Sequence, residues 1–162
     1  MSISAGDALP GATLTKMGPD GPEQVDLAKI TKGRKVAIFA VPGAYTPTCT
    51  MAHLPSFIRT KAQFDEKGVD EIVCISVNDP FVLNAWGEET GAHDAGITIL
   101  GDAESAFTTA IGMDFTAPPA GLIARSKRYA MLVEDNVVKV LHVEDSPGTC
   151  EATAGEALLA EL

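Results

Sequence analysis

The sequence lacks any uninterrupted apolar run near the roughly 20 residues that a membrane-spanning helix needs. Its first residues, Met1-Ser-Ile-Ser-Ala-Gly-Asp, have neither the basic region nor the apolar region of a secretory leader. We therefore expect a soluble protein with no membrane partner. The expected location is the cytoplasm, or an organelle if a targeting peptide has been removed.

Positive charge is also scarce. Lys and Arg total 12 against 22 Asp and Glu, which gives a net charge of −10. Binding to nucleic acid or to an anionic membrane needs a basic face that displaces counterions, and this composition argues against one. We expect small molecules or other proteins as partners.

Cysteine occurs only three times, as Cys49, Cys74 and Cys150. An odd number of widely spaced cysteines does not fit the disulfide framework of a secreted protein. In a reducing compartment such residues are structural thiols or take part in redox chemistry.

The sequence has no internal repeat, no low-complexity tract and no linker rich enough in Pro, Gly or Ser to divide it. With 162 residues, 46% of them hydrophobic, the chain suits one domain over residues 1–162. The longest candidate loop is 112–124, which contains Pro118-Pro119.

Five runs of apolar and β-branched residues predict strands that are mostly buried on both faces. They are Lys35 to Val41, Glu71 to Val77, Ile97 to Leu100, Arg128 to Val133 and Val137 to Val143. The last two are separated only by Glu134-Asp135-Asn136, so they form an antiparallel hairpin.

Helix patterns lie between the strands. Apolar residues at 54, 57, 58 and 62 share one face, Asp79-Pro80 begins a helix over 81–89, and Asp102 caps one over 103–111. Thr153 and Glu156 have the spacing of a capping box for a last helix. The order predicts an α/β protein with a central mixed sheet flanked by helices, the outline of a thioredoxin-like fold.

The first predicted strand runs into Pro42-Gly-Ala-Tyr-Thr-Pro-Thr-Cys49, and the helical pattern begins at about Cys49. Unpaired N–H groups and the helix dipole favour a thiolate at such a position. The Thr46 hydroxyl can reach the sulfur or a bound peroxide, and Pro42 can shield the sulfur from water. Positive charge for a developing oxyanion is expected from Arg125-Ser-Lys-Arg128.

The pattern Pro42-x3-Thr46-x2-Cys49 resembles the active-site motif of peroxiredoxins, in the subgroup of peroxiredoxin 5 and the plant type II enzymes. Further matches follow in order and cover nearly the whole chain, namely His53-Leu-Pro, Ser76-Val-Asn-Asp-Pro-Phe81 and Lys127-Arg-Tyr129.

This resemblance implies a thiol peroxidase that reduces hydrogen peroxide and alkyl hydroperoxides without metal, flavin or haem. Cys49 would be the peroxidatic cysteine, and Thr46 and Arg128 would bind the peroxide. A thiol then reduces the Cys49 sulfenic acid, with electrons from thioredoxin or from glutathione and glutaredoxin. The family also implies a homodimer.

The resolving thiol is left open by the sequence. Relatives use a cysteine near the C-terminus, one near the position of Cys74, or an external thiol. Cys74 lies in an apolar strand, whereas Cys150 follows Ser146-Pro-Gly-Thr149 and is easier to move. We favour Cys150, with external reduction as the alternative.

The same residues allow other interpretations. Cys49 and His53, at i and i+4, have the spacing of two ligands of a metal site. No second Cys/His pair accompanies them to complete such a site. For His53 we expect a role in bracing the loop through hydrogen bonds, with the role of a general base as the alternative. Arg125 is expected to be a secondary residue of the site. A dithiol oxidoreductase needs Cys-x-x-Cys, where this chain has Thr46. A peroxide-sensing redox relay or a binding protein on the same fold is the alternative function.

Overall fold

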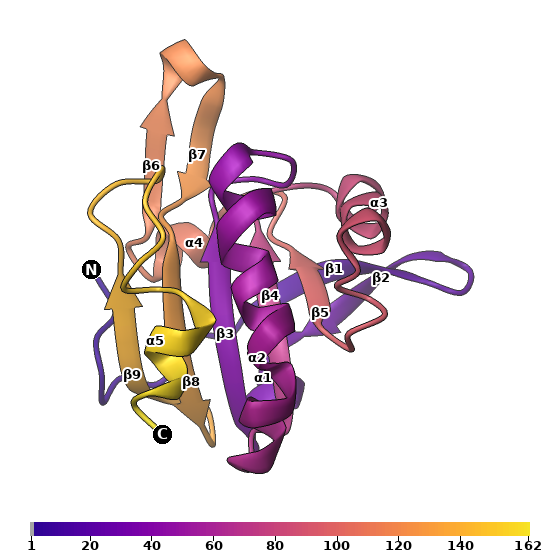
Figure 1. Cartoon of the computed structure of the whole chain (residues 1–162). Coiled ribbons are helices and arrows are strands. Elements are labelled where there is room, and N and C mark those ends of the chain that lie inside the picture. Colours follow the sequence, from indigo (N-terminus) through magenta and orange to yellow (C-terminus); the bar gives the residue numbers. More distant parts are fainter. Residues whose placement is uncertain (1) are drawn as a thin grey trace.

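A seven-stranded mixed sheet forms the centre of the protein in the computed structural model, which describes residues 2–162 (Figure 1). The strands are β1 (Thr13–Gly18), β2 (Gly21–Asp26), β3 (Lys35–Val41), β4 (Glu71–Ser76), β5 (Thr98–Gly101), β6 (Asp114–Ala117), β7 (Leu122–Ser126), β8 (Tyr129–Glu134) and β9 (Val137–Val143). The helices are α1 (Leu27–Thr31), α2 (Leu54–Glu66), α3 (Pro80–Thr90), α4 (Ala106–Ala110) and α5 (Gly155–Leu159), with a π-helical turn η1 (Cys49–His53) and a 3₁₀ turn η2 (Pro118–Ala120). None of the described helices is long and apolar enough to cross a membrane.

The sheet has the strand order β2-β1-β5-β4-β3-β8-β9. Strand β3 pairs in parallel with β4, and β4 with β5, whereas β8 is antiparallel to both β3 and β9. The prediction of a mixed sheet ending in an antiparallel hairpin is therefore confirmed. All five predicted strands are present, with ends that agree to within one residue.

Two hydrophobic clusters cover the two faces of the sheet because alternate residues of a strand point to opposite sides. Ala37, Phe39 and Val41 of β3 belong to one cluster, and Val36, Ile38 and Ala40 belong to the other. The first cluster packs under α2, α3 and α5, and α2 and α5 lie side by side over the sheet in Figure 1. Cys49 and Cys74 are both part of this first cluster.

The structure adds elements that the sequence patterns did not predict. Strands β1 and β2 form an antiparallel hairpin at one edge of the sheet, followed by the short helix α1. Residues 112–124 are not a simple loop, because β6 and β7 form a second, two-stranded sheet that begins there, with η2 between the two strands. Figure 1 shows this β6–β7 hairpin standing beyond the end of the main sheet, next to the start of the segment that leads into α2.

Two helix starts differ from the predictions. The α4 helix begins at Ala106 rather than at 103, although the Asp102 carboxylate does cap it by accepting from the N–H groups of Phe107 and Thr108. The predicted capping box at Thr153 and Glu156 is wrong. Helix α5 begins at Gly155, and Ala154 at its N-cap position makes no side-chain hydrogen bond. The Thr153 N–H and hydroxyl donate to Glu144 instead, and Glu156 pairs with Arg59.

Candidate active site

Cys49 is the first residue of the π-helical turn η1, just beyond the turn that follows β3. Helical structure begins at Pro47, so Cys49 lies in the first turn, as the sequence predicted. In η1 the Leu54 N–H donates to the Cys49 carbonyl, an i to i+5 bond, and Pro55 then occupies the first turn of α2. The Cys49 side chain is fully buried in the first hydrophobic cluster.

The Thr46 hydroxyl contacts the sulfur. Its Oγ1 lies 2.7 Å from Cys49 Sγ and 2.8 Å from the Gly43 carbonyl oxygen. A hydroxyl has one proton, so it cannot donate to both neighbours at once. With a Cys49 thiol, the S–H donates to Thr46 while Thr46 donates to Gly43; with a thiolate, Thr46 donates to sulfur. The same hydroxyl therefore serves both protonation states of Cys49.

Arg128 brings a buried positive charge to the same sulfur. Its Nη2 lies 3.1 Å from Cys49 Sγ and also donates to the Pro147 carbonyl oxygen at 2.9 Å. Arg128 is only 1% exposed, and it takes part in none of the ion pairs recorded among residues 2–162. A buried charge without a carboxylate partner is costly unless another anion accompanies it. A Cys49 thiolate, or an oxyanion bound beside the sulfur, would supply the anion that offsets the buried charge of Arg128.

His53 holds Arg128 in place. Burial, together with the Arg128 charge, lowers the pKa of His53 to about 3, so the ring is neutral near pH 7. A guanidinium has only donors, so Nδ1 of His53 accepts from Arg128 Nη1 at 2.9 Å. The proton is then on Nε2, which donates to the Thr153 carbonyl oxygen at 2.9 Å. With both nitrogens engaged, the geometry supports the bracing role of His53 rather than the general-base role.

A cavity of about 410 Å³ opens beside the sulfur. Pro42, Thr46 and Arg128 line it, together with residues that the sequence patterns did not single out: Pro47, Thr48, Ala120, Leu122, Pro147 and Gly148. Because Thr46 and Arg128 line the cavity and also contact Cys49, a small ligand in the cavity lies close to the Cys49 sulfur. The predicted residues Pro42, Thr46, Cys49 and Arg128 are thus brought together.

Arg125 lies at the edge of this group. Its Nη1 donates to the Pro42 carbonyl oxygen at 3.2 Å, so it supports the loop that carries Pro42. Gly43 leaves room for this contact, since a Cβ atom there would collide with the Arg125 guanidinium. Arg125 has no recorded contact with Cys49 among the described residues, which fits the secondary place given to it.

The sequence matches the redoxin family over residues 4–159. Peroxiredoxin-2E-2, chloroplastic, from Oryza sativa subsp. japonica is 47% identical to it over 98% of this chain and 72% of its own length. Peroxiredoxin-2F, mitochondrial, from Arabidopsis thaliana is 42% identical over 84% of this chain and 67% of its own length. The chain belongs to the redoxin family as a peroxiredoxin.

Solved structures of peroxiredoxins share the fold. Reduced Prx3 from Vibrio vulnificus in complex with H₂O₂ superposes with a TM-score of 0.91 at 42% identity, covering 98% of each chain. Peroxiredoxin 5 from Alvinella pompejana gives a TM-score of 0.85 at 32% identity, covering 98% of this chain and 96% of its own. The thioredoxin-like fold is therefore confirmed, and this peroxiredoxin is a thiol-dependent peroxidase.

All three cysteines of this peroxiredoxin are free. Cys74 lies in the central strand β4 and is fully buried, and burial raises the pKa of its thiol well above the usual value. Cys150 is only partly buried, in the loop between β9 and α5, and burial raises the pKa of this thiol too. Of the two, Cys150 has more freedom to move.

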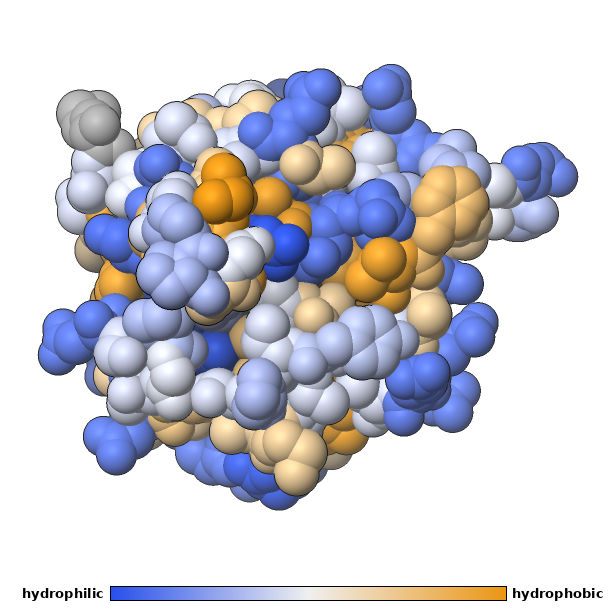
Figure 2. All heavy atoms as spheres, turned by 90° about the horizontal axis from the view of Figure 1, so that it is seen from above, coloured by the Kyte–Doolittle hydropathy of each residue, from blue (hydrophilic) through white to orange (hydrophobic). Residues whose placement is uncertain are grey.

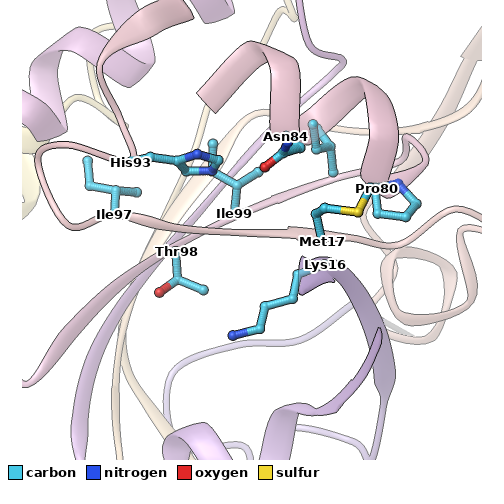
Figure 3. Close-up of a pocket in the computed structure, with 9 residues that line it drawn as sticks. Lys16, Met17, Pro80, Asn84, His93, Ile97, Thr98 and Ile99 are labelled. Atoms are coloured by element: carbon cyan, nitrogen blue, oxygen red, sulfur yellow. The ribbon is translucent and has the colours of Figure 1, made fainter. Parts of the chain in front are cut away.

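No group of three or more His, Cys, Asp or Glu side chains with the geometry of a metal site occurs in residues 2–162 of this peroxiredoxin. Figure 3 shows a second pocket, of about 280 Å³, between β1, α3 and β5. Lys16, Asn84, His93 and Thr98 line it with apolar neighbours, and none of the predicted site residues is among them. It offers no cysteine for peroxide chemistry.

Proposed function

We propose that Cys49 is the peroxidatic residue of this enzyme and that Thr46 and Arg128 bind the peroxide. The Cys49 thiolate attacks the terminal oxygen of hydrogen peroxide or an alkyl hydroperoxide, and the O–O bond breaks. The departing oxygen takes up a proton and leaves as water or an alcohol, and Cys49 becomes a sulfenic acid. Pro42 forms part of the wall that limits access of water.

The observation that carries this proposal is the convergence of two donors on one sulfur. Thr46 Oγ1 at 2.7 Å and Arg128 Nη2 at 3.1 Å stabilise a thiolate, and both also line the cavity. As the O–O bond breaks, negative charge moves onto the leaving oxygen, where the same donors are within reach. Donors that are in place before the reaction stabilise a transition state without reorganisation.

Cys150 is the proposed resolving residue. Its thiol attacks the Cys49 sulfenic sulfur, a disulfide forms, and the sulfenic oxygen leaves as water. Thioredoxin, or glutathione with glutaredoxin, then returns the disulfide to two thiols. Support comes from the loop of Cys150, in which the Gly148 carbonyl accepts from Thr48 Oγ1 at 3.0 Å, next to Cys49. Direct reduction of the sulfenic acid by glutathione or glutaredoxin is the alternative route.

Resolution requires the buried sulfur to become accessible, and we place that opening in η1. Pro55 has no N–H to donate to the preceding turn, and the π-helical bond of Leu54 replaces an ordinary α-helical one. Such π-helical turns are frequent at functional sites. The opening of this turn would expose Cys49 to Cys150 or to an external thiol.

One domain over residues 1–162 and a homodimer complete the proposal. Several large apolar side chains are exposed, namely Tyr45, Met51, Phe81 and Ile123, and two of them are sequence neighbours of the cavity residues Thr46 and Leu122. Figure 2 views the molecule of Figure 1 from above and shows hydrophobic patches among polar residues. Such patches often mark an interface between proteins. The proposed location is the cytoplasm, with an organelle as the alternative that the chloroplastic and mitochondrial relatives support.

Trapping of the sulfenic acid tests the role of Cys49. Reduced protein is treated with one equivalent of hydrogen peroxide in the presence of dimedone, and each cysteine peptide is then analysed by mass spectrometry. We expect the dimedone adduct on Cys49, and more of it in Cys150→Ser, where the sulfenic acid persists. An adduct confined to Cys74 or Cys150 would contradict the proposal.

A further inference from the structure

The loop between β9 and α5, residues 144–154, carries Cys150 and is fixed at two places. The first lies on the side of the cavity, where Arg128 Nη2 donates to the Pro147 carbonyl at 2.9 Å and Thr48 Oγ1 donates to the Gly148 carbonyl at 3.0 Å. These contacts belong to the site already described.

The second place lies on the other side of Cys150, at Glu151 and Thr153, where one carboxylate oxygen accepts three hydrogen bonds. Oε2 of Glu144 accepts from the Glu151 N–H at 2.9 Å, the Thr153 N–H at 2.8 Å and the Thr153 hydroxyl at 2.7 Å. Burial alone would raise the pKa of Glu144, but these hydrogen bonds and the Arg128 charge hold it below its usual value. The carboxylate is therefore ionised near pH 7 and remains a strong acceptor.

Thr153 links this carboxylate to the active site. It is fully buried, and its carbonyl oxygen accepts from His53, the residue that holds Arg128. Cys150 lies between the two fixed places, two residues after Gly148 and one before Glu151, and its sulfur is 3.9 Å from Thr153 Oγ1. Hydrogen bonds on both sides of Cys150, at Gly148 and at Glu151, therefore restrict its movement.

We propose that Glu144 is a positioning residue that acts as a latch on the resolving step. Its three hydrogen bonds keep the loop closed around Cys150, and their release limits the rate at which the Cys49–Cys150 disulfide forms. This inference rests on the proposed function of Cys150. The reaction itself is unchanged: the Cys150 sulfur bonds to the Cys49 sulfur, and the sulfenic oxygen leaves as water with the Cys150 proton.

The latch also affects inactivation by excess peroxide. While the sulfenic acid waits for Cys150, a second peroxide molecule can oxidise it to sulfinic acid, with release of water or alcohol. A slower release of the loop gives this competing reaction more time. Glu144 therefore increases the fraction of enzyme that is overoxidised at each turnover.

The test compares Glu144→Ala and Glu144→Gln with the matched control Glu151→Gln. Glu151 is exposed, and its carboxylate has no recorded ion pair or hydrogen bond in the described part of the chain, so this control removes one charge from the same loop. Reduced protein receives one equivalent of hydrogen peroxide, and samples are quenched with an alkylating reagent at successive times. Mass spectrometry then counts thiol, disulfide and sulfinic acid on each cysteine.

We expect disulfide formation about tenfold faster in Glu144→Ala, the factor that corresponds to about 1.4 kcal/mol. Glu144→Gln keeps a neutral acceptor and should show a smaller increase. Loss of the Cys49 thiol, the first step, should stay within about twofold of wild type in all variants. A fold that was merely loosened would not accelerate one step and spare the other.

The outcomes separate the latch from the proposal on which it rests. If wild type forms no Cys49–Cys150 disulfide, the resolving role of Cys150 is wrong and the latch with it. If wild type forms the disulfide but Glu144→Ala and Glu144→Gln are as slow as Glu151→Gln, or slower, the latch alone is wrong. Glu144→Gln retains the size and polarity of the side chain, so the second outcome can be read even if Glu144→Ala does not fold.

Discussion

The Nδ1 atom of His53 accepts a hydrogen bond from Nη1 of Arg128 at 2.9 Å, and the same arginine contacts the Cys49 sulfur at 3.1 Å. A neutral histidine is thus interposed between the active-site cation and the Thr153 carbonyl. A protonated His53 has no lone pair to accept from Arg128 and adds a second positive charge beside it.

A pH dependence of stability follows from His53. Its pKa is about 3 in the folded state against a usual value of 6.5, so between these values the unfolded chain binds a proton that the folded chain does not. The free energy of unfolding therefore falls as the pH falls through this window, by up to about 1.4 kcal/mol per pH unit from this residue. In His53→Gln that contribution is absent, and the difference from wild type should shrink or reverse towards low pH.

Denaturant unfolding at pH 7, 6, 5 and 4 measures this difference. His93→Gln is the matched control, because His93 is exposed and lies outside the active site. Parallel stability curves for wild type and His53→Gln would show that His53 does not titrate in this way.

Substitutions of Thr46 test whether its hydroxyl supports the reaction of the Cys49 sulfur. Thr46→Val keeps the shape but removes the group that lies 2.7 Å from Cys49 Sγ, whereas Thr46→Ser retains it. We expect the second-order rate constant for Cys49 oxidation by hydrogen peroxide to fall about 10²-fold in Thr46→Val, as for loss of other preorganised donors. Thr46→Ser should stay within a few-fold of wild type. Equal rate constants for Cys49 oxidation in Thr46→Val and Thr46→Ser would show that the Thr46 hydroxyl takes no part in the reaction.

Substitution of Arg128 tests whether the buried guanidinium supports the reaction of Cys49. Arg128→Lys keeps the charge, but an ammonium cannot contact the sulfur, His53 and the Pro147 carbonyl in the planar geometry of a guanidinium. The rate of Cys49 oxidation should fall by on the order of 10²-fold. Arg125→Lys is the control. Within residues 2–162 the recorded side-chain hydrogen bond of Arg125 goes to the Pro42 carbonyl and not to the sulfur, so a change of a few-fold is expected. If the rate of Cys49 oxidation fell further in Arg125→Lys than in Arg128→Lys, Arg125 and not Arg128 would be the arginine that supports the reaction.

The turn that carries Cys49 is expected to open more readily than the helix that follows it. Backbone amide hydrogen exchange should be faster in η1 than in the middle of α2, since Pro55 leaves this turn short of one hydrogen bond. Exchange in η1 that is as slow as in the middle of α2 would contradict the proposed opening. Pro55→Ala restores the missing N–H and should slow exchange in η1.

The central strands were predictable because their residues are apolar on consecutive positions. In β3 every residue from Val36 to Val41 is buried, which few loops or surface helices imitate. The β1–β2 hairpin was missed because β2, at the edge of the sheet, is polar and exposed along most of its length. Its turn, Gly18-Pro-Asp-Gly21, carries the residues of a hairpin connection and was the available signal.

The site was predictable where a local motif carries it, as at Pro42, Thr46 and Cys49. The contact of Arg128 with Cys49 joins residues 79 apart in the sequence. The need for positive charge pointed to the basic cluster at 125–128, and resemblance to a family selected Arg128 within it. The contact of Glu144 with Thr153 had no such signal. Thr153 was interpreted as a local helix cap, but a carboxylate nine residues away takes both of its donors. A local sequence pattern does not show that an acceptor distant in the sequence will bind the donors of a predicted helix cap.

Steady-state consumption of hydrogen peroxide by wild type, Cys49→Ser, Cys74→Ser and Cys150→Ser tests the central claim most directly. Each protein is assayed with thioredoxin and, separately, with glutathione plus glutaredoxin. We predict that Cys49→Ser loses turnover with both reductants, that Cys74→Ser retains it, and that Cys150→Ser loses the thioredoxin-driven part. Peroxide turnover that survives in Cys49→Ser would contradict the account.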